Sequence, residues 1–366
     1  MGNTPQKTCL KQDLAREFAE YRIVASPLNP DFCFEEILSE VNECRVVKTN
    51  SRRQVYHLQT PAGGYFLKRS TLVRAKDRLR HFILPRRRWA EWRNLHRLRH
   101  ARVPAARPLS KGLLKIRHPR SYFVLTEQVL GAHMPVNSFE NAQILGQYTA
   151  FLHRRKVYHA DLNRHNIILT PQGQFFLIDV QEVFFLPGMP YRLRIHNLGK
   201  ILFNFCTLSN PERWTAELLK GYHKGYDKRI STTAVIKAAK LHQQRRYRSR
   251  SKRCCKNSTE FAVVKSDDWK GYRRKIFRWR PMELQEALEK GQPIKGTHVV
   301  SYRGVCIKSQ PRRWFHSDRC RISWKMSRAL EVRGIAVPRS LGYFVINNFS
   351  CFLAELLADR CHLNTY

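Results

Sequence analysis

Short runs of alternating apolar and polar residues near the start of the chain predict β-strands. Three such runs follow one another, at residues 45–48, 54–58 and 65–68. The polar segment between the first two and a Pro-Ala-Gly-Gly turn before the third predict an antiparallel meander that ends at Lys68. Residues 1–40 show no periodic signal and are interpreted as an N-terminal extension.

Helical spacing appears next, in a strongly basic stretch from Arg74 to Arg102 that is broken at Pro85. Its apolar residues recur three positions apart, at Trp89, Trp92, Leu95 and Leu98, and predict one buried helix face. Residues 122–127 form an apolar run that predicts a buried strand. From Ser138 a second apolar stripe predicts a core helix that ends in a basic cluster at 154–156.

Candidate chemistry is concentrated between Tyr158 and Asp179. This stretch reads as a polar loop, a short apolar strand, a tight turn and a second apolar strand that ends in a carboxylate. Such a hairpin would hold Asp161, Asn166 and Asp179 near one point. Phosphoryl transfer needs a carboxylate to orient the attacking hydroxyl and oxygen ligands for magnesium. The alternative is a surface hairpin with two unrelated acids and an Asn turn.

Composition changes this picture mainly through charge. The 366 residues include 67 Lys and Arg against 28 Asp and Glu, a net charge of +39. Such an excess predicts a polyanionic neighbour, which could be nucleic acid, anionic lipid or a phosphorylated glycolipid. The ten cysteines form no C-x-x-C pair, and no apolar run is long enough for a secretory or membrane-spanning segment. We therefore expect reduced thiols in the cytoplasm and only peripheral membrane contact.

The spacing around the hairpin resembles the catalytic core of protein-kinase-like enzymes. His159 and Asp161 are separated by one residue, Asn166 follows Asp161 by five positions, and Asp179 follows thirteen later. The resemblance implies an α+β, two-lobed fold with a mainly antiparallel small lobe and a mainly helical large lobe. Lys68 and Glu91 would then form the pair that positions the nucleotide phosphates. The alternatives are a solvated strand-end lysine and a local surface ion pair.

Departures from the protein-kinase pattern point to one branch. The first strand loop lacks glycines, so Ser51, Arg52 and Arg53 would contact phosphates with side chains. No glycine completes an Asp-Phe-Gly motif, no long activation segment follows Asp179, and Ala160 and Asn163 replace the usual basic residues. The His159–Ile167 motif with Ile178 and Asp179 is similar to the lipopolysaccharide-core kinases, which act on 3-deoxy-D-manno-octulosonic acid (Kdo) or heptose. The likeness covers about residues 40–240.

This resemblance implies ATP and Mg2+ as cofactors and assigns roles residue by residue. The catalytic residues would be Asp161, Lys68 and Glu91; the nucleotide contacts Lys68, Glu127, Val129, Asn166 and Asp179; the magnesium ligands Asn166 and Asp179; and the acceptor contacts His159, Asn163 and His165. In the segment around Glu127 and Val129, adenine is expected to be read by backbone groups.

The C-terminal third repeats part of the pattern. Residues 41–241 are interpreted as the kinase-like domain and 242–256 as a basic, solvated linker. Beyond it, Gly304–Lys308 echoes Gly64–Lys68, residues 324–342 echo residues 92–112 with Gly342 aligned to Gly112, and Cys351–Glu355 echoes Phe123–Glu127. Residues 257–366 are therefore predicted to be an incomplete, degenerate second small lobe. Ser323 replaces Glu91 there, so this part is not expected to act as a kinase; the alternative is chance similarity.

Together these features predict an ATP-dependent kinase for a Kdo or heptose hydroxyl of the lipopolysaccharide inner core. The expected partners are this lipid A-linked glycolipid and the anionic inner face of the cytoplasmic membrane, where the enzyme would bind peripherally. The basic face of residues 74–102 is the expected docking surface. Two rivals are a Ser/Thr protein kinase with a reduced activation segment and a pseudokinase scaffold. Nucleic-acid binding rests on charge alone and is not expected.

Overall fold

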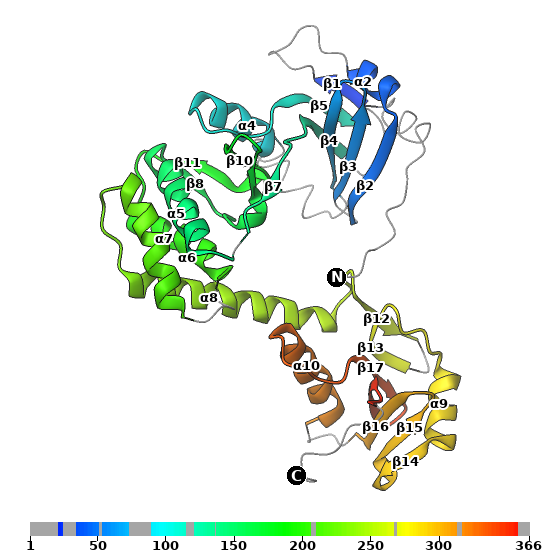
Figure 1. The fold of residues 1–366 in the computed structure, drawn as a ribbon. Helices are drawn as coiled ribbons and strands as arrows, with labels where there is room; N and C mark the ends of the chain where they lie inside the picture. The colour runs from blue at the N-terminus through cyan, green and yellow to red at the C-terminus, as the bar shows by residue number, and fades with distance from the viewer. Residues whose placement is uncertain are drawn as a thin grey trace. The chain divides into compact units, whose positions relative to one another are not determined.

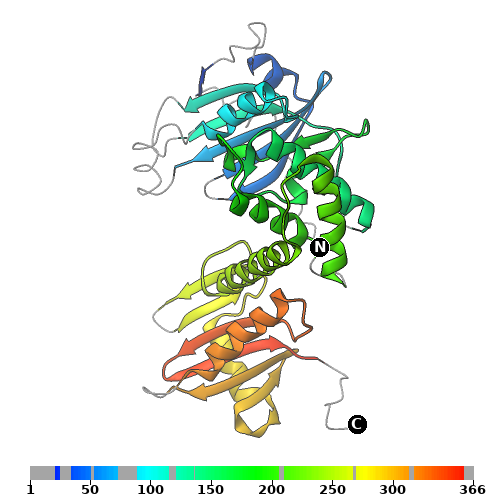
Figure 2. The same ribbon diagram turned by 90° about the vertical axis from the view of Figure 1, so that its left-hand side faces the viewer.

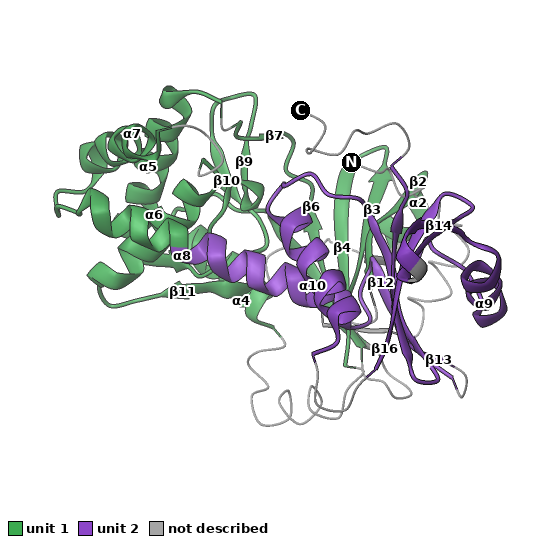
Figure 3. Ribbon diagram, turned by 90° about the horizontal axis from the view of Figure 1, so that it is seen from below, with its two compact units in different colours: residues 1–240 green, residues 241–366 purple. Residues whose placement is uncertain are grey.

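The computed structural model describes residues 21–24, 34–50, 53–72, 89–114, 121–135, 137–205, 210–266, 269–312 and 317–357. The chain forms two compact units, residues 1–240 (unit 1) and 241–366 (unit 2), which are distinguished by colour in Figure 3. Each unit is described by itself.

Unit 1 begins with an antiparallel sheet in the order β1-β5-β6-β4-β3-β2 (Figure 1). Its strands are Tyr21–Val24 (β1), Glu43–Asn50 (β2), Arg53–Thr60 (β3), Gly63–Thr71 (β4), Pro108–Leu114 (β5) and Ser121–Glu127 (β6). Helix α2 (Phe34–Glu40) packs through Ile37 on a core that includes Leu58, Leu67 and Phe123. The predicted meander and the strand at 122–127 are confirmed.

Strand β1 lies inside the stretch that was interpreted as an N-terminal extension. It pairs antiparallel with β5, from Tyr21 opposite Leu114 to Val24 opposite Lys111. The extension therefore contributes an edge strand to the sheet, and α2 also precedes the predicted boundary at residue 41. The four-residue strand carries too little alternation to be recognised from the sequence alone.

Helix α4 (Ala90–His100) is the described part of the basic stretch from Arg74 to Arg102. Its buried face consists of Trp92, Leu95 and Leu98, as the spacing predicts, together with Glu91 and Asn94. Residues 73–88, which carry much of the expected docking surface, lie outside the described residues.

The large lobe of unit 1 is mainly helical. Its helices are α5 (Phe139–Arg154), α6 (Tyr191–Phe203), α7 (Pro211–Gly225) and the first part of α8 (Thr232–Ser251). Ser138 caps α5 by accepting a hydrogen bond from the Asn141 amide at 3.2 Å. Glycines allow α5 and α7 to pack closely, because a Cβ on Gly146 would lie 2.0 Å from the Leu218 carbonyl oxygen. The predicted core helix from Ser138 is confirmed.

Short strands support the loops between these helices. Strands β7 (Ala132–His133), β9 (Ile167–Leu169) and β10 (Phe175–Leu177) form one sheet, and β8 (Val157–His159) pairs with β11 (Val183–Phe185). In β9 and β10, Ile167 lies opposite Leu177 and both are fully buried. The predicted strand-turn-strand between the polar loop at residues 159–166 (the catalytic loop) and Asp179 is confirmed. The α+β, two-lobed architecture is confirmed with it.

Unit 2 contains a seven-stranded antiparallel sheet in the order β12-β13-β17-β18-β16-β15-β14. Its strands are Phe261–Lys265 (β12), Trp269–Arg274 (β13), Gln292–Lys295 (β14), Val299–Tyr302 (β15), Val305–Pro311 (β16), Ser340–Ile346 (β17) and Phe349–Glu355 (β18). Helix α9 (Pro281–Lys290) precedes β14, and α10 (Arg319–Val332) lies across one face of the sheet (Figure 2). The order β17-β18-β16-β15-β14 repeats the order β5-β6-β4-β3-β2 of unit 1.

The register supports this repeat residue by residue. Lys68 lies opposite Val124 in unit 1, and Lys308 lies opposite Phe352 in unit 2 at the equivalent ladder position. The backbone amide of Gln128 donates to the Gly64 carbonyl at 2.8 Å, and Leu356 donates to Gly304 at the same distance. These matches agree with the echoes in the sequence of the two strands.

Two details of the sequence interpretation differ from the structure. The stretch 242–256, interpreted as a solvated linker, is helical: α8 continues to Ser251 and a 3₁₀ turn at Lys252–Cys255 follows. Its Gln and Arg residues favour helix despite their polarity. Gly342 was aligned with Gly112, but β17 has a bulge between Ser340 and Gly342 that matches the bulge between Pro108 and Ser110. Gly342 is therefore the equivalent of Ser110.

Candidate active site

A buried histidine supports the catalytic loop through hydrogen bonds. His159 is fully buried, its Nδ1 accepts a hydrogen bond from the Asp161 amide at 3.1 Å, and its carbonyl accepts one from Asn197 of α6 at 2.7 Å. This arrangement leaves the Asp161 side chain 62% exposed at the end of the loop. The loop therefore presents a carboxylate that an acceptor molecule could reach.

Polar side chains close the loop around the Asp161 backbone. The Asp161 carbonyl accepts hydrogen bonds from Asn166 Nδ2 at 2.9 Å and Asn163 Nδ2 at 3.0 Å. The Asn166 carbonyl in turn accepts from the Ile178 amide at 3.0 Å, directly before Asp179. The structure thus brings Asp161, Asn166 and Asp179 to one point, as the sequence predicts.

Lys200, on α6, contacts Asp161 directly. Its Nζ donates to Asp161 Oδ1 at 2.8 Å and also to the Ala160 carbonyl. The lysine side chain is 21% exposed, so this ion pair is partly shielded from water. No spacing pattern signals this residue, which lies 39 positions from Asp161 in the sequence.

We expect Lys200→Met to lower kcat about 100-fold while the KM for ATP changes less than threefold. The substitution removes the donor that fixes Asp161, and misplacing a reacting group by about 1 Å costs that much in rate. Steady-state kinetics on the purified full chain provide the measurement. The matched control is Lys220→Met, because Lys220 is 60% exposed and its ion pair among the described residues is with Glu217 on its own helix. A wild-type kcat in Lys200→Met would contradict a positioning role.

Glu91 is the centre of a buried polar network. Its side chain is 4% exposed, and Oε1 accepts a hydrogen bond from Lys68 Nζ of β4. Oε2 accepts from Gln181 Nε2 at 3.0 Å and from Arg53 Nη2 at 3.4 Å. The predicted pairing of Lys68 with Glu91 is therefore present. A buried carboxylate needs such partners, since an uncompensated buried charge is costly.

Asn94 ties the same helix to the segment after Asp179. Its Nδ2 donates to the carbonyls of Val180 at 2.8 Å and Val183 at 2.9 Å. Gln181, which stands where a protein kinase has the motif glycine, adds the bond to Glu91. Side-chain hydrogen bonds from Asn94 and Gln181 therefore connect helix α4 to the segment after Asp179.

Asp179 adopts a left-handed backbone conformation, with φ 54° and ψ 52°. Asp tolerates this region better than most residues, but it is uncommon and often accompanies functional sites. The Asp179 side chain is 45% exposed, and Arg53 Nη2 lies 3.5 Å from its Oδ1. Arg53 thus places a cation between Glu91 and Asp179. Ser51 and Arg52, the other expected phosphate contacts, lie outside the described residues.

The segment after β6 is the one predicted to bind adenine through its backbone groups. Among the described residues, the backbone amide and carbonyl of Val129 have no hydrogen-bond partner, so both are available to a ligand. The Glu127 amide donates instead to the Arg107 carbonyl at 3.0 Å, and its carboxylate lies 3.2 Å from Arg107. The Glu127 side chain and amide are therefore used within the protein.

The three predicted acceptor contacts differ in position. The prediction that His159 contacts the acceptor is wrong, because its ring is buried inside the fold and cannot touch a sugar. Asn163 is half-buried, and its Oδ1 accepts a hydrogen bond from the His165 amide at 2.9 Å, so it shapes the loop. His165 is exposed beside His133, with ring centroids 5.5 Å apart. Of the three, His165 has the position that best suits an acceptor contact.

Buried histidines give the large lobe a predictable pH dependence. Burial lowers the pKa of His159 to about 4, against weaker opposing effects of Asp161 and Asp179. Burial likewise lowers the pKa of His153 to about 4; its ring contacts Tyr222 and Asn197. Both rings are therefore neutral at pH 7, and the unfolded chain binds more protons than the folded chain between about pH 6.5 and pH 4.

We expect the free energy of unfolding to be greatest above about pH 6.5 and to fall as the pH decreases towards 4. The loss by pH 5 should be about 2 kcal/mol for each buried histidine. Urea titrations at pH 7 and pH 5 measure it. His153→Gln should reduce the difference, whereas His100→Gln, at an exposed position, should leave it unchanged. An equal difference in the free energy of unfolding between pH 7 and pH 5 in both variants would contradict the assignment of this pH dependence to the buried histidines.

The sequence of this chain is similar to a family of lipopolysaccharide kinases and to individual proteins of known function. Residues 35–222, just over half of the chain, match the lipopolysaccharide kinase (Kdo/WaaP) family. A 3-deoxy-D-manno-octulosonic acid kinase of Stenotrophomonas maltophilia (strain R551-3) is 29% identical over 170 residues, covering 43% of this chain and 63% of that protein. The same enzyme of Xylella fastidiosa (strain M12) is 41% identical over 59 residues, 16% of this chain and 23% of that protein.

Among solved structures, the complex of WbdD with the kinase inhibitor LY294002 has a TM-score of 0.35 at 14% identity. It covers 67% of this chain and 56% of that chain. No helix among the described residues has the length and apolar content needed to cross a bilayer. The family match covers the meander, α4, the catalytic loop and Asp179, so this chain belongs to the lipopolysaccharide kinase (Kdo/WaaP) family.

Proposed function

We propose that this protein transfers the γ-phosphoryl group of ATP to a sugar hydroxyl of a lipopolysaccharide-core acceptor. The observation that carries the proposal is the convergence of Asp161, Asn166 and Asp179 beside the Lys68–Glu91 pair. Phosphoryl transfer depends almost entirely on positioning and on charge stabilisation, and these residues supply both. The similarity to Kdo kinases favours Kdo as the acceptor sugar, with heptose as the other candidate.

In this mechanism the acceptor hydroxyl donates a hydrogen bond to Asp161, which orients it and accepts its proton during transfer. Lys200 holds the carboxylate in place from α6. Lys68, kept in position by Glu91, contacts the nucleotide phosphates, and Arg53 adds a second cation on the same side. The backbone of Val129 would read the adenine.

The donor atoms near Asp179 suit magnesium. Asp179 supplies a carboxylate, and Asn166 supplies an amide oxygen, because its bond to the Asp161 carbonyl is made by Nδ2. Hard cations prefer such oxygen ligands and usually share them with phosphates and water. The described residues include no cluster of three or more His, Cys, Asp or Glu that could hold a metal alone. When bound, magnesium would neutralise the charge of the phosphates.

The proposal also accounts for the rival readings. Ala160 and Asn163 leave the loop without the basic residues expected of a protein kinase, and Asn163 caps the turn before His165 instead. A pseudokinase would have no need for a complete Asp161, Asn166 and Asp179 set. Attachment to the inner face of the cytoplasmic membrane remains part of the proposal and rests on the net charge of +39.

Radiolabelled ATP distinguishes these possibilities. The full chain is incubated with magnesium and core-truncated lipopolysaccharides that end in different sugars, and peptides serve as a parallel acceptor. We expect label in one lipopolysaccharide and none in the peptides, with Asp161→Asn as the inactive control. Label in peptides alone would support a protein kinase, and no label in any acceptor would support the scaffold.

A further inference from the structure

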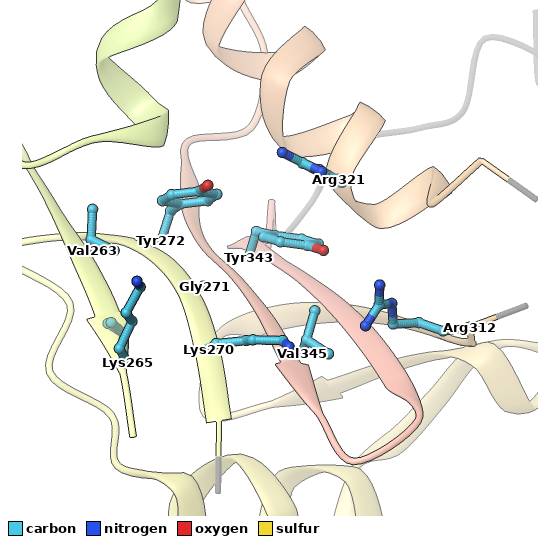
Figure 4. Close-up of a pocket in the computed structure, with 10 residues that line it drawn as sticks. Val263, Lys265, Lys270, Gly271, Tyr272, Arg312, Arg321, Tyr343 and Val345 are labelled. Atoms are coloured by element: carbon cyan, nitrogen blue, oxygen red, sulfur yellow. The ribbon is translucent and has the colours of Figure 1, made fainter. Parts of the chain in front are cut away.

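Unit 2 contains a basic pocket on the hairpin formed by β12 and β13. Among the described residues of unit 1, β5 has one outer neighbour, the short strand β1, whereas in unit 2 the equivalent strand β17 pairs with β13, which pairs in turn with β12. The pocket, of about 210 Å³, lies on this addition, beside α10 (Figure 4). It also lies outside residues 35–222, which match the kinase family.

The strand register places the lining side chains on one face. Tyr272 lies opposite both Val263 and Tyr343, and its ring stacks on that of Tyr343 with centroids 6.1 Å apart and an interplanar angle of 23°. Directly opposed residues of an antiparallel sheet project to the same side. Tyr343 is buried and Tyr272 is half-buried, so Tyr272 supplies the accessible part of the aromatic wall.

Four cations surround this wall: Lys265, Lys270, Arg312 and Arg321. Lys265 and Lys270 lie directly opposite each other, and like charges in this arrangement are destabilising. All four side chains are exposed, and among the described residues none forms an ion pair with a carboxylate. Asp267 and Asp268, which separate the two strands in the sequence, lie outside the described residues.

One carboxylate, that of Asp318, bonds to two residues that line the pocket. Asp318, the N-cap residue of α10, accepts hydrogen bonds from the Tyr343 hydroxyl at 2.6 Å and from the Arg321 amide at 2.9 Å. It also accepts one from Gln310 at 3.4 Å. The pocket therefore has a net positive charge that the described protein does not balance.

We propose that this pocket binds an anionic sugar, one that carries a phosphate or carboxylate group, within the glycolipid acceptor. The inference rests on the proposed function for the identity of the glycolipid. The cations match the charged group, and the Tyr272 ring offers an apolar face to a sugar ring. The volume is below the roughly 300–1,000 Å³ of sites for drug-sized ligands, so it suits a single ring. Because unit 2 is linked to unit 1 in one chain, such binding would raise the effective concentration of acceptor.

The test measures equilibrium binding of a soluble, deacylated core oligosaccharide, with and without its phosphate groups, to the full chain without ATP. Lys270→Glu replaces an exposed cation of the pocket, and Lys295→Glu makes the same charge change at an exposed position of β14 outside it. We expect Lys270→Glu to raise the Kd for the phosphorylated probe about tenfold or more and Lys295→Glu to change it less than twofold. Removing the phosphates should weaken binding to the wild type and reduce the difference between the variants.

Equal affinity of the phosphorylated probe for wild type and Lys270→Glu would overturn the inference. Phosphatidylglycerol vesicles are tested in parallel. If Lys270→Glu weakened binding to the vesicles but not to the oligosaccharide, the ligand would be a lipid headgroup and the inference would also be overturned. Turnover is measured separately with labelled ATP. If the wild type phosphorylates the acceptor but Lys270→Glu does not change binding, the pocket inference is refuted and the kinase proposal stands. If Lys270→Glu weakens binding but the wild type shows no turnover, the kinase proposal alone is refuted.

Discussion

Asp161→Asn is expected to reduce kcat by roughly two to four orders of magnitude, the range for loss of a positioned general base. The effect should fall on the chemical step, because the Asp161 side chain is 62% exposed at the loop end and, among the described residues, its carboxylate pairs with Lys200 of α6. Asn can still accept a hydrogen bond from Lys200, so the loop should keep its conformation. Turnover with labelled ATP and equilibrium binding of ATP provide the two measurements.

Asp227→Asn is the matched control, since it removes an exposed carboxylate of the same unit outside the site. It should retain wild-type kcat. ATP affinity should be the same in both variants and in the wild type. A folded Asp161→Asn protein with near-normal turnover would exclude Asp161 as the base and would direct attention to another acceptor-side group.

The catalytic loop could be predicted because its information is local. Asp161, Asn166 and Asp179 lie within one loop-strand-turn-strand, and the burial of β9 and β10 follows directly from their apolar residues. The pair Lys68 and Glu91 required a resemblance as well, since the two residues belong to a strand and a helix whose packing no periodicity describes. The structure places them in contact.

Lys200, Asn94 and Gln181 could not be predicted for the same reason. Each acts across a tertiary contact: Lys200 reaches Asp161 from α6, Asn94 bonds to carbonyls after Asp179, and Gln181 reaches Glu91. Their sequence neighbours carry no signal for these partners. His159 shows the opposite error, because its place in the motif suggested an acceptor contact while burial gives it a supporting role.

Only part of unit 2 could be predicted by comparing its sequence with that of unit 1. The echoes at Gly304–Lys308 and at Cys351–Glu355 correspond to equivalent strands, because strand cores keep their residues in register. Among the described residues of unit 1, the hairpin β12–β13 has no counterpart of its length, so comparison with the described part of unit 1 does not reveal the hairpin or its pocket. In the predicted alignment Ser323 takes the place of Glu91, and Lys308 has no carboxylate partner among the described residues, so the difference in the hairpin is the feature of unit 2 that suggests a separate role.

Asp179→Asn is expected to raise the magnesium concentration needed for half-maximal activity at least tenfold and to lower the rate at saturation by about two orders of magnitude. A hard cation loses a charged oxygen ligand, and the phosphates lose part of the charge that stabilises their transfer. Asn tolerates the left-handed backbone at φ 54°, so the segment held by Asn94 should remain in place. Magnesium titrations of activity and of nucleotide binding measure the two effects.

Arg53 provides the control that separates metal binding from the ion pair, because it lies 3.5 Å from Asp179. Arg53→Gln removes the same ion pair without removing an oxygen ligand. It should raise the KM for ATP through lost phosphate contact but leave the magnesium dependence of activity unchanged. If Asp179→Asn showed the same profile as Arg53→Gln, the carboxylate would serve only to hold the arginine, and the magnesium ligands would have to be sought elsewhere in the site.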